Sequence, residues 1–204
     1  MRRFNRAFHV RSIRLATVFF ISVSALGWGY PLRAAVAECL WDHLPSAAQD
    51  AIYAAYEADG LDGLDRVGPD NSQIEQLYAV CSRHRGQASV EELGTTGFVL
   101  VGISLEKSAA HHIGQSEGVT AIDLLNAWRG LPENDRGRLR QAYLATANGD
   151  SSATEGVSLI LDRAVKLASS RSRLGVPPSR NARYLHYANF FLGIAQSEAF
   201  ENQL

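Results

Sequence analysis

The chain has 204 residues, of which 20 are basic, 21 are acidic and 46% are hydrophobic. This hydrophobic content excludes a disordered or low-complexity chain. Residues 1–37 hold six arginines and no acidic residue, so residues 38–204 carry 14 basic and 21 acidic side chains, a net charge of −7. That charge argues against general nucleic-acid binding, which needs a basic surface.

Residues 1–37 have the pattern of a secretory signal peptide. Five arginines lie within residues 1–14, an apolar run extends from Leu15 to Leu26, and small side chains occupy positions 35 and 37. A basic start, an apolar stretch shorter than the roughly 20 residues of a spanning helix, and small residues at −3 and −1 of the cleavage site are typical of exported chains. We expect cleavage after Ala37; an uncleaved membrane anchor is the alternative.

Composition also indicates where the exported chain would go. Arginine outnumbers lysine by 18 to 2, which suggests a GC-rich bacterial genome. We therefore expect residues 38–204 to be periplasmic in a Gram-negative bacterium, or secreted. No segment after the signal peptide is apolar enough to span a bilayer, so we expect no membrane span after cleavage.

The exported chain has two cysteines, Cys39 and Cys81. An even number of cysteines in an oxidising compartment favours a disulfide. Cys81 lies on the apolar stripe of a predicted helix with Ile74, Leu77 and Tyr78, whereas Cys39 lies near the start of the mature chain. The predicted bridge therefore ties the N-terminus to a core helix; two separate thiols are the alternative.

A sequence pattern occurs twice in the chain. The copies, 87 residues apart, pair Trp41 with Trp128, Leu44 with Leu131, Pro45 with Pro132, and Tyr56 with Tyr143. A second match, 91 residues apart, pairs Gly102-Ile103 with Gly193-Ile194. Because residues 38–204 contain two tryptophans, both in the pattern, we predict a tandem duplication of a unit of roughly 80 to 90 residues. The units are residues 38–117 and 118–204, which we expect to form one compact domain.

The paired aromatic residues have two interpretations. An indole just before Leu-Pro packs the junction at which the chain enters a helix, in the manner of a hydrophobic staple, and we favour this structural role. The alternative is an apolar ligand pocket between the two units, lined by Trp41, Trp128, Tyr56 and Tyr143.

The periodicity within both units is helical. Apolar residues in 157–168 recur at i, i+3, i+4, i+7, i+8 and i+11, as an amphipathic helix requires. We predict an all-α fold with six main helices and one connecting helix. The main helices are expected around residues 46–58, 74–81, 90–110, 132–147, 157–168 and 184–200, with the connector at 118–129. Residues 98–105 are rich in β-branched residues, so a strand is the alternative there.

Four aspartates lie in the glycine-rich segment 59–70. A calcium-binding EF-hand loop needs oxygen ligands at positions 1, 3 and 5. Counted from Asp59, positions 3 and 5 are Leu61 and Gly63, so the pattern fails. We interpret the segment as a polar loop of turn-forming residues.

One group of residues has side chains that could bind a metal: Glu106, His111, His112 and Glu117. Adjacent histidines point about 100° apart on a helix, and no HExxH motif is present, so further ligands would have to come from elsewhere. A solvated helix end, where histidine suits the negative pole of the helix dipole, is the simpler interpretation. The group nevertheless makes a metal-assisted hydrolase an alternative function.

The two units differ in charge. Residues 38–117 hold 13 acidic and 4 basic side chains, whereas residues 118–204 hold 8 and 10. A phosphate, a lipid headgroup or an acidic protein surface could bind at the basic stretch that contains Arg171, Arg173, Arg180 and Arg183. A solvated loop, or attraction to the acidic first unit, is the simpler interpretation.

Motifs of known catalytic sites are missing from the sequence. It contains no GxSxG, CxxC or phosphate-binding loop, and nothing in it points to a cofactor. We therefore favour an exported, non-catalytic helical protein that binds an envelope protein or a small ligand. This preference comes from architecture, which by itself does not determine function.

Overall fold

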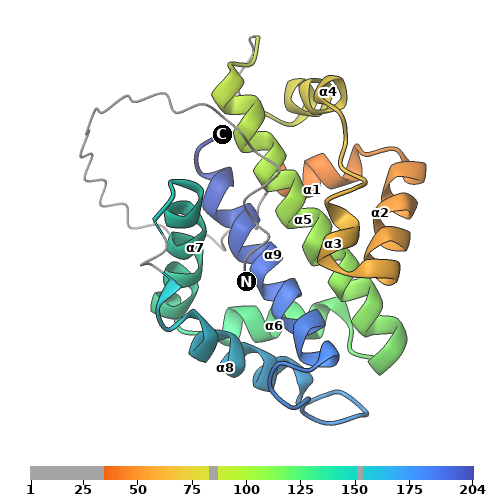
Figure 1. The fold of residues 1–204 in the computed structure, drawn as a ribbon, viewed down its shortest axis with the longest axis vertical. Coiled ribbons are helices and arrows are strands. Elements are labelled where there is room, and N and C mark those ends of the chain that lie inside the picture. The colour runs from red at the N-terminus through yellow and green to blue at the C-terminus, as the bar shows by residue number, and fades with distance from the viewer. Residues whose placement is uncertain (1–34, 83–86, 151–153) are drawn as a thin grey trace. The chain divides into compact units, whose positions relative to one another are not determined.

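The structure, a computed structural model, describes residues 35–82, 87–150 and 154–204, and these ranges contain helices and no strand (Figure 1). The elements are α1 (Ala35–Asp42), α2 (Ser46–Asp59), α3 (Leu61–Leu64), α4 (Asn71–Cys81), α5 (Val90–Glu117), α6 (Ala121–Gly130), α7 (Glu133–Ala147), α8 (Val157–Ser169) and α9 (Ala182–Glu201). The predicted all-α class is therefore confirmed. Residues 98–105 lie inside α5, so the strand alternative is wrong.

Two of the helices were not expected from the sequence. The four-residue α3 lies in the predicted polar loop. Helix α1 begins at Ala35, within the predicted signal peptide, whose residues 1–34 lie outside the described ranges. Ala37 is fully buried, and the backbone N–H of Val36 donates to the carboxylate of Glu201 at 2.7 Å. Ala37 is therefore part of the packed core in this structure.

The two Leu-Pro pairs produce the same local geometry. Pro45 precedes α2 with φ −53° and ψ 139°, and Pro132 precedes α7 with φ −53° and ψ 141°. In both places the leucine N–H donates to the tryptophan carbonyl three residues earlier, at 3.1 Å. Proline lacks an N–H and has a fixed φ, so it suits the start of a helix, where the first N–H groups have no intrahelical partner.

Side-chain caps fix the starts of other helices. Asp70, Ser89 and Thr120 each accept a hydrogen bond from the backbone N–H three residues later. In each case the side chain of that later residue bonds back to the N-cap N–H, forming a capping box. The polar residues between the apolar stripes thus set where α4, α5 and α6 begin.

Helices α5 and α9 pack against each other more extensively than any other pair and run side by side through the middle of the fold (Figure 1). One hydrophobic cluster joins α1, α2 and α4 to the first half of α5 and the end of α9. A second joins α6, α7 and α8 to the second half of α5 and most of α9. No helix in the described part of the chain has the length and hydropathy to cross a membrane.

Candidate functional site

The repeated tryptophans pack into different clusters of the core. Trp41 is 6% exposed and lies 5.5 Å from the ring of Tyr53, whereas Trp128 is 3% exposed and stacks on Phe191. The indole N–H of Trp128 donates to the carboxylate of Glu198 at 3.1 Å. Both indoles therefore serve as packing elements at the ends of α1 and α6.

The remaining members of the repeated pattern lie at or beside the core. Leu44 and Leu131 are buried where the chain turns into α2 and α7, and Tyr56 is 1% exposed. Tyr143 is partly buried and contacts both clusters. Burial raises the pKa of Tyr143 far above the ordinary value of a phenol.

Cys39 and Cys81 form the predicted pair. Their Sγ atoms lie 2.12 Å apart, which is disulfide bonding distance, and the bond ties α1 to the last residue of α4. The imidazole of His43, one helical turn after Cys39, lies 3.5 Å from the Cys39 Sγ and 4.0 Å from the Cys81 Sγ. Among the described residues, Cys39, His43 and Cys81 form the group of possible metal-binding side chains whose ligand atoms lie within 4.8 Å of one another. With the sulfurs bonded to each other, the group presents one imidazole.

The predicted metal ligands on α5 are engaged with separate partners. His111 stacks on Tyr53 at 4.5 Å and lies 2.8 Å from the amide nitrogen of Gln115. Glu106 is 4% exposed, and Glu117, also buried, bonds to a different set of residues at the end of the helix. The structure therefore does not bring Glu106, His111, His112 and Glu117 together.

The four arginines of the predicted anion site also take different positions. Arg183 forms an ion pair with buried Glu117 at 2.8 Å, and Arg171 forms one with Asp123. Arg173 donates from Nε to the backbone carbonyl of Glu117, and Arg180 is exposed. Two of the four guanidinium groups are thus committed to carboxylates within the chain.

A polar cluster that the sequence did not reveal lies where α2, α5 and α9 meet. The rings of His112 (α5) and His186 (α9) stack with centroids 3.8 Å apart. His112 Nδ1 lies 2.8 Å from a carboxylate oxygen of Glu57, and His186 Nδ1 lies 3.0 Å from the hydroxyl of Tyr56. That hydroxyl also accepts a hydrogen bond from the amide of Asn189 at 3.1 Å.

The hydrogen bonds of the Tyr56 hydroxyl indicate which atoms of this cluster carry protons. Because the Asn189 amide donates to the Tyr56 oxygen, the hydroxyl proton remains available for His186 Nδ1. Burial raises the pKa of Tyr56 to about 12, so the phenol keeps its proton near neutral pH. Burial lowers the pKa of His186, and a positive charge on His112 acts in the same direction. The arrangement thus favours a neutral His186 with its ring proton on Nε2.

A hollow of about 280 Å³ opens beside this cluster. It is lined by Asp59, Gly60, Leu61, Asp62, Ala182, Leu185, His186 and Asn189. The lining combines two carboxylates, a neutral imidazole and an amide with aliphatic side chains, and it includes no serine, threonine or cysteine. Such a set of groups can bind and orient a small molecule.

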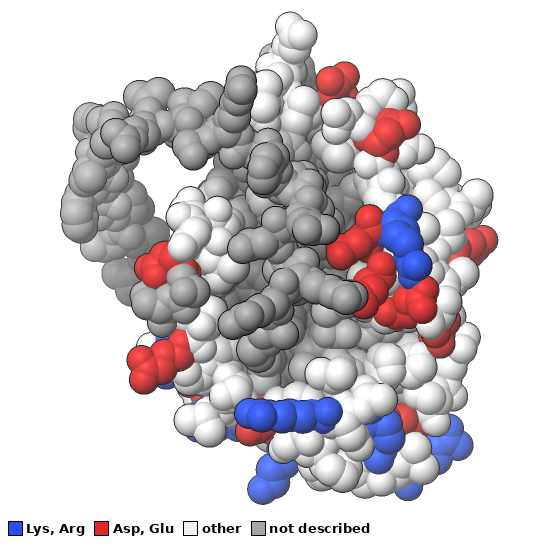
Figure 2. All heavy atoms as spheres, in the orientation of Figure 1, with Lys and Arg blue, Asp and Glu red and all other residues white. Residues whose placement is uncertain are grey.

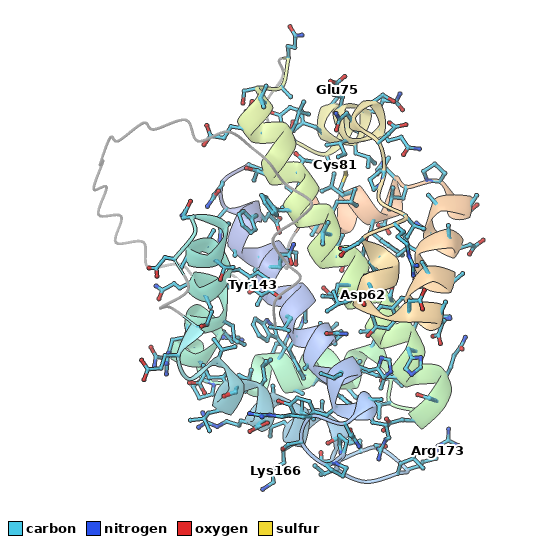
Figure 3. The ribbon with its side chains drawn as sticks, viewed as in Figure 1. Asp62, Glu75, Cys81, Tyr143, Lys166 and Arg173 are labelled. Atoms are coloured by element: carbon cyan, nitrogen blue, oxygen red, sulfur yellow. A yellow bond between two sulfur atoms is a disulfide. The ribbon has the colours of Figure 1, made fainter. Side chains whose placement is uncertain are left out.

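Two glycines shape the wall that carries the carboxylates. Gly60 adopts a φ of 60°, in the left-handed region that favours glycine, and its N–H donates to the Tyr56 carbonyl at 2.7 Å. A side chain at Gly63 would overlap the carbonyl of Ala55, so glycine lets α3 fold closely against α2. This tight turn places Asp62, which lines the hollow, on α3 beside α2 (Figure 3).

Most residues of this site could not be found from the sequence. Tyr56 of α2 and His186 of α9, which are in contact, are 130 positions apart in the sequence. No short sequence motif could therefore contain both residues. The sequence indicates His112, together with His111, as a candidate metal ligand, but it does not indicate the observed partners of His112, which are Glu57 and His186.

Comparison with known proteins does not relate this site to a known family. No protein-family model, curated protein or solved structure matches the chain.

Proposed function

We propose that the chain is an exported, non-catalytic helical protein that binds a small ligand in the hollow beside His186. The observation that carries the proposal is the convergence of Asp62, His186 and Asn189 on one concave, partly apolar surface. Ligand sites are typically concave and largely apolar, with a few polar groups that orient the ligand.

The charges around the hollow favour a cationic ligand. Asp59 forms an exposed ion pair with Arg66, which offsets its negative charge, whereas Asp62 forms no ion pair with another described residue. Residues 38–117, which supply half of the lining residues, hold 13 acidic and 4 basic side chains. Figure 2 shows acidic side chains gathered on the side of the molecule where α2 and α3 lie. A small amine with an aliphatic body would match both the carboxylates and the leucines of the lining.

Three probes with the same carbon skeleton test this proposal. Butylamine, butanol and butyrate are titrated separately into isotopically labelled protein at constant pH, and the backbone amide signals are followed by NMR. We expect butylamine to shift the signals of Gly60, Leu61 and His186, and butanol and butyrate to leave them unchanged. Equal shifts with all three probes, or shifts elsewhere, would contradict a cation site.

A matched pair of variants separates the site from general charge effects. Asp62→Asn removes a carboxylate from the lining, and Asp65→Asn removes one from the same loop outside the lining. We expect Asp62→Asn to weaken butylamine binding about five-fold, the effect of roughly 1 kcal/mol for a charge pair in water, and Asp65→Asn to have little effect. Similar losses in both variants would show that the overall negative field, and not the hollow, attracts the amine.

Export is part of the same proposal. It is supported by the signal-like pattern of residues 1–37 and by the Cys39–Cys81 pair, because disulfides persist in oxidising compartments. A periplasmic location would also place the hollow where small amines from the medium reach it first.

A tandem duplication would explain the arrangement of helices. Shifted by 87 residues, α1, α2 and α4 fall on α6, α7 and α8 to within one residue at either end. Shifted by 91 residues, the start of α5 falls one residue before that of α9. Leu44 and Leu131 would then be equivalent, so Leu44→Ala and Leu131→Ala should cost similar unfolding free energies, within the 2–5 kcal/mol typical of buried leucines. A large cost for one and none for the other would count against equivalence.

A further inference from the structure

The connection between α8 and α9, residues 170–181, presents aliphatic side chains to solvent. Leu174 is 59% exposed and Val176 is 52% exposed, one residue apart on either side of Gly175. Arg173 precedes this pair and Arg180 follows it, and both are exposed. Single exposed aliphatic residues are ordinary on protein surfaces, but here two of them lie together with cations on both sides.

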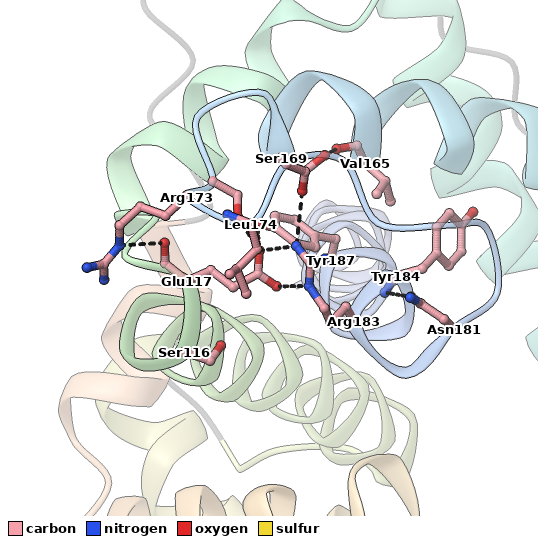
Figure 4. A network of polar contacts seen from close by, with 12 residues as sticks. Ser116, Glu117, Val165, Ser169, Arg173, Leu174, Asn181, Arg183, Tyr184 and Tyr187 are labelled. Carbon is pink, nitrogen blue, oxygen red and sulfur yellow. Dashed lines mark hydrogen bonds and ion pairs between the residues drawn. The ribbon is translucent and has the colours of Figure 1, made fainter.

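Contacts with buried Glu117 hold this loop in place. The Glu117 carboxylate accepts hydrogen bonds from Ser172 and from two nitrogens of Arg183, at 3.0 and 2.8 Å for the latter (Figure 4). Arg183 also donates to the carbonyl of Gly175 at 3.0 Å, directly between the two aliphatic residues. Pro177, in the same loop, is buried. The loop therefore displays Leu174 and Val176 in a fixed conformation.

Arg180 is held in a conformation that a non-glycine residue rarely adopts. Its φ is 65°, in the left-handed region, which costs about 1–2 kcal/mol for a residue with a Cβ. The fold thus keeps an arginine where glycine would be more stable.

The cations around the tip are available to an outside partner. Lys166 in α8, Arg173 and Arg180 take part in none of the ion pairs between described residues, in contrast to Arg171 and Arg183. Lys166 and Arg173 point outward at the same end of the molecule (Figure 3). The acidic side chains around α2 and α3 lie away from this end, where basic ones gather (Figure 2).

We propose that residues 170–181 form a docking loop for an anionic phospholipid surface. Leu174 and Val176 enter the headgroup region, while Lys166, Arg173 and Arg180 contact lipid phosphates. The loop projects from the helices (Figure 1), and such a convex tip suits a deformable bilayer better than the concave pocket that a protein partner would need to provide. The inference does not depend on the hollow beside His186, because no residue of 170–181 lines that hollow and the hollow has its own test.

Hydrogen–deuterium exchange of the full chain tests this docking with a local readout. The protein is exchanged alone, with vesicles of phosphatidylcholine, and with vesicles of equal parts phosphatidylcholine and phosphatidylglycerol. We expect the mixed vesicles to slow exchange in residues 172–180, and this protection to shrink as salt rises from about 0.1 M to 1 M, where screening shortens from about 10 to 3 Å. Because the readout is local, binding through residues 1–37 does not imitate the result.

Paired variants distinguish docking from folding. Leu174→Ser and Arg180→Gln alter the loop, whereas Leu159→Ser on α8 and Arg129→Gln on α6 make the same changes at other exposed positions. We expect lipid affinity measured from loop protection to fall about five-fold for Arg180→Gln and about ten-fold or more for Leu174→Ser, and to stay within two-fold, roughly, for both controls.

Arg180→Gly provides the sharpest comparison. Glycine relieves the positive φ while removing the charge, so this variant should unfold at a higher temperature than the parent and yet bind the mixed vesicles more weakly. The proposal is overturned if the mixed vesicles leave exchange in residues 172–180 unchanged, or if phosphatidylcholine alone protects them equally. A loop that instead serves an acidic protein surface would give the first of these results.

Discussion

Gly102 of α5 and Gly193 of α9 lie face to face where the two central helices cross. A Cβ on Gly102 would lie 2.9 Å from the carbonyl oxygen of Gly193, and a Cβ on Gly193 would lie 2.7 Å from the carbonyl oxygen of Gly102. The relationship is reciprocal, and these are the two glycines that the sequence pairs at a spacing of 91 residues. The absence of both side chains lets the backbones of α5 and α9 approach each other closely at this point.

Alanine at either glycine should destabilise the fold. Because the obstructing atoms belong to backbone, they cannot move aside as a flexible side chain would, and overpacking of this kind typically costs about 1–3 kcal/mol. Chemical denaturation of Gly102→Ala and Gly193→Ala measures the loss. Gly94→Ala, in the same helix but with open space around its Cβ, should instead stabilise by about 0.5–1 kcal/mol. A neutral Gly193→Ala would contradict the close crossing.

Loss of the Cys39–Cys81 bond should also lower stability. In the chain-entropy model, closing a loop of this length stabilises the native state by about 4 kcal/mol, with typical measured values of about 2–4. Urea denaturation with and without a dithiol reductant should reveal the difference. The double variant Cys39→Ser with Cys81→Ser should have the same unfolding midpoint as the reduced protein, and the reductant should not change it. An unchanged unfolding midpoint in reductant would show that the bond contributes nothing.

Glu117 should account for a loss of stability in acid. Burial opposes its charge, but hydrogen bonds from Arg183, Ser172 and Tyr187 outweigh that effect and lower its pKa. A lowered pKa in the folded state means that stability is fully present above the ordinary value near 4.5 and is lost as pH falls through the folded pKa. Denaturation curves across this range should show a smaller loss in Glu117→Gln than in the parent. Some loss should persist, because other carboxylates with lowered pKa values remain in the variant, namely Asp70, Asp123 and Glu133.

The same substitution is informative at neutral pH. Glu117→Gln removes a buried carboxylate that accepts hydrogen bonds from Arg183, Ser172 and Tyr187, and hydrogen bonds to a charged group contribute about 1.5–3 kcal/mol. The matched control is Glu133→Gln, whose exposed pairs with Arg136 and Arg140 should contribute less than about 1 kcal/mol. Equal costs for the two variants would argue against the anchoring role of Glu117.

His186 should make stability depend on pH in a higher range. Burial lowers its pKa below 6.5, so the unfolded chain binds more protons than the folded chain between the two values. Stability should therefore be level above 6.5, fall as pH drops below it, and level off again beneath the folded pKa. The variant His186→Gln should lack this step, whereas His43→Gln, at an exposed position, should retain it. If His186→Gln kept the step, another group would be responsible.

Local signals in the sequence were sufficient for the fold class and for the positions of the helices other than α1 and α3. Pro45 and Pro132 start helices because of the chemistry of proline itself, and the apolar spacing of residues 157–168 predicts α8 without knowledge of the rest of the chain. The pairing of Cys39 with Cys81 could be predicted from the count of cysteines and from the expectation of an oxidising compartment.

The hollow and its polar cluster could not be predicted in this way. The contact between His112 and His186 depends on how α5 and α9 cross, which no sequence period encodes. The fixed docking loop is a similar case: its arginines were visible in the sequence, but the commitment of Arg183 to buried Glu117 became visible with the fold. Helix α1 was missed because its first residues look like a cleavage site.

Export is the claim on which the proposed location, the disulfide and the membrane-facing role all depend. The most direct test is the intact mass of the untagged protein recovered from each fraction of its native cells. The account predicts a chain that begins at Glu38, is found outside the cytosol, and weighs two hydrogens less than its reduced form. A cytosolic chain that begins at Met1 with both thiols free would contradict it.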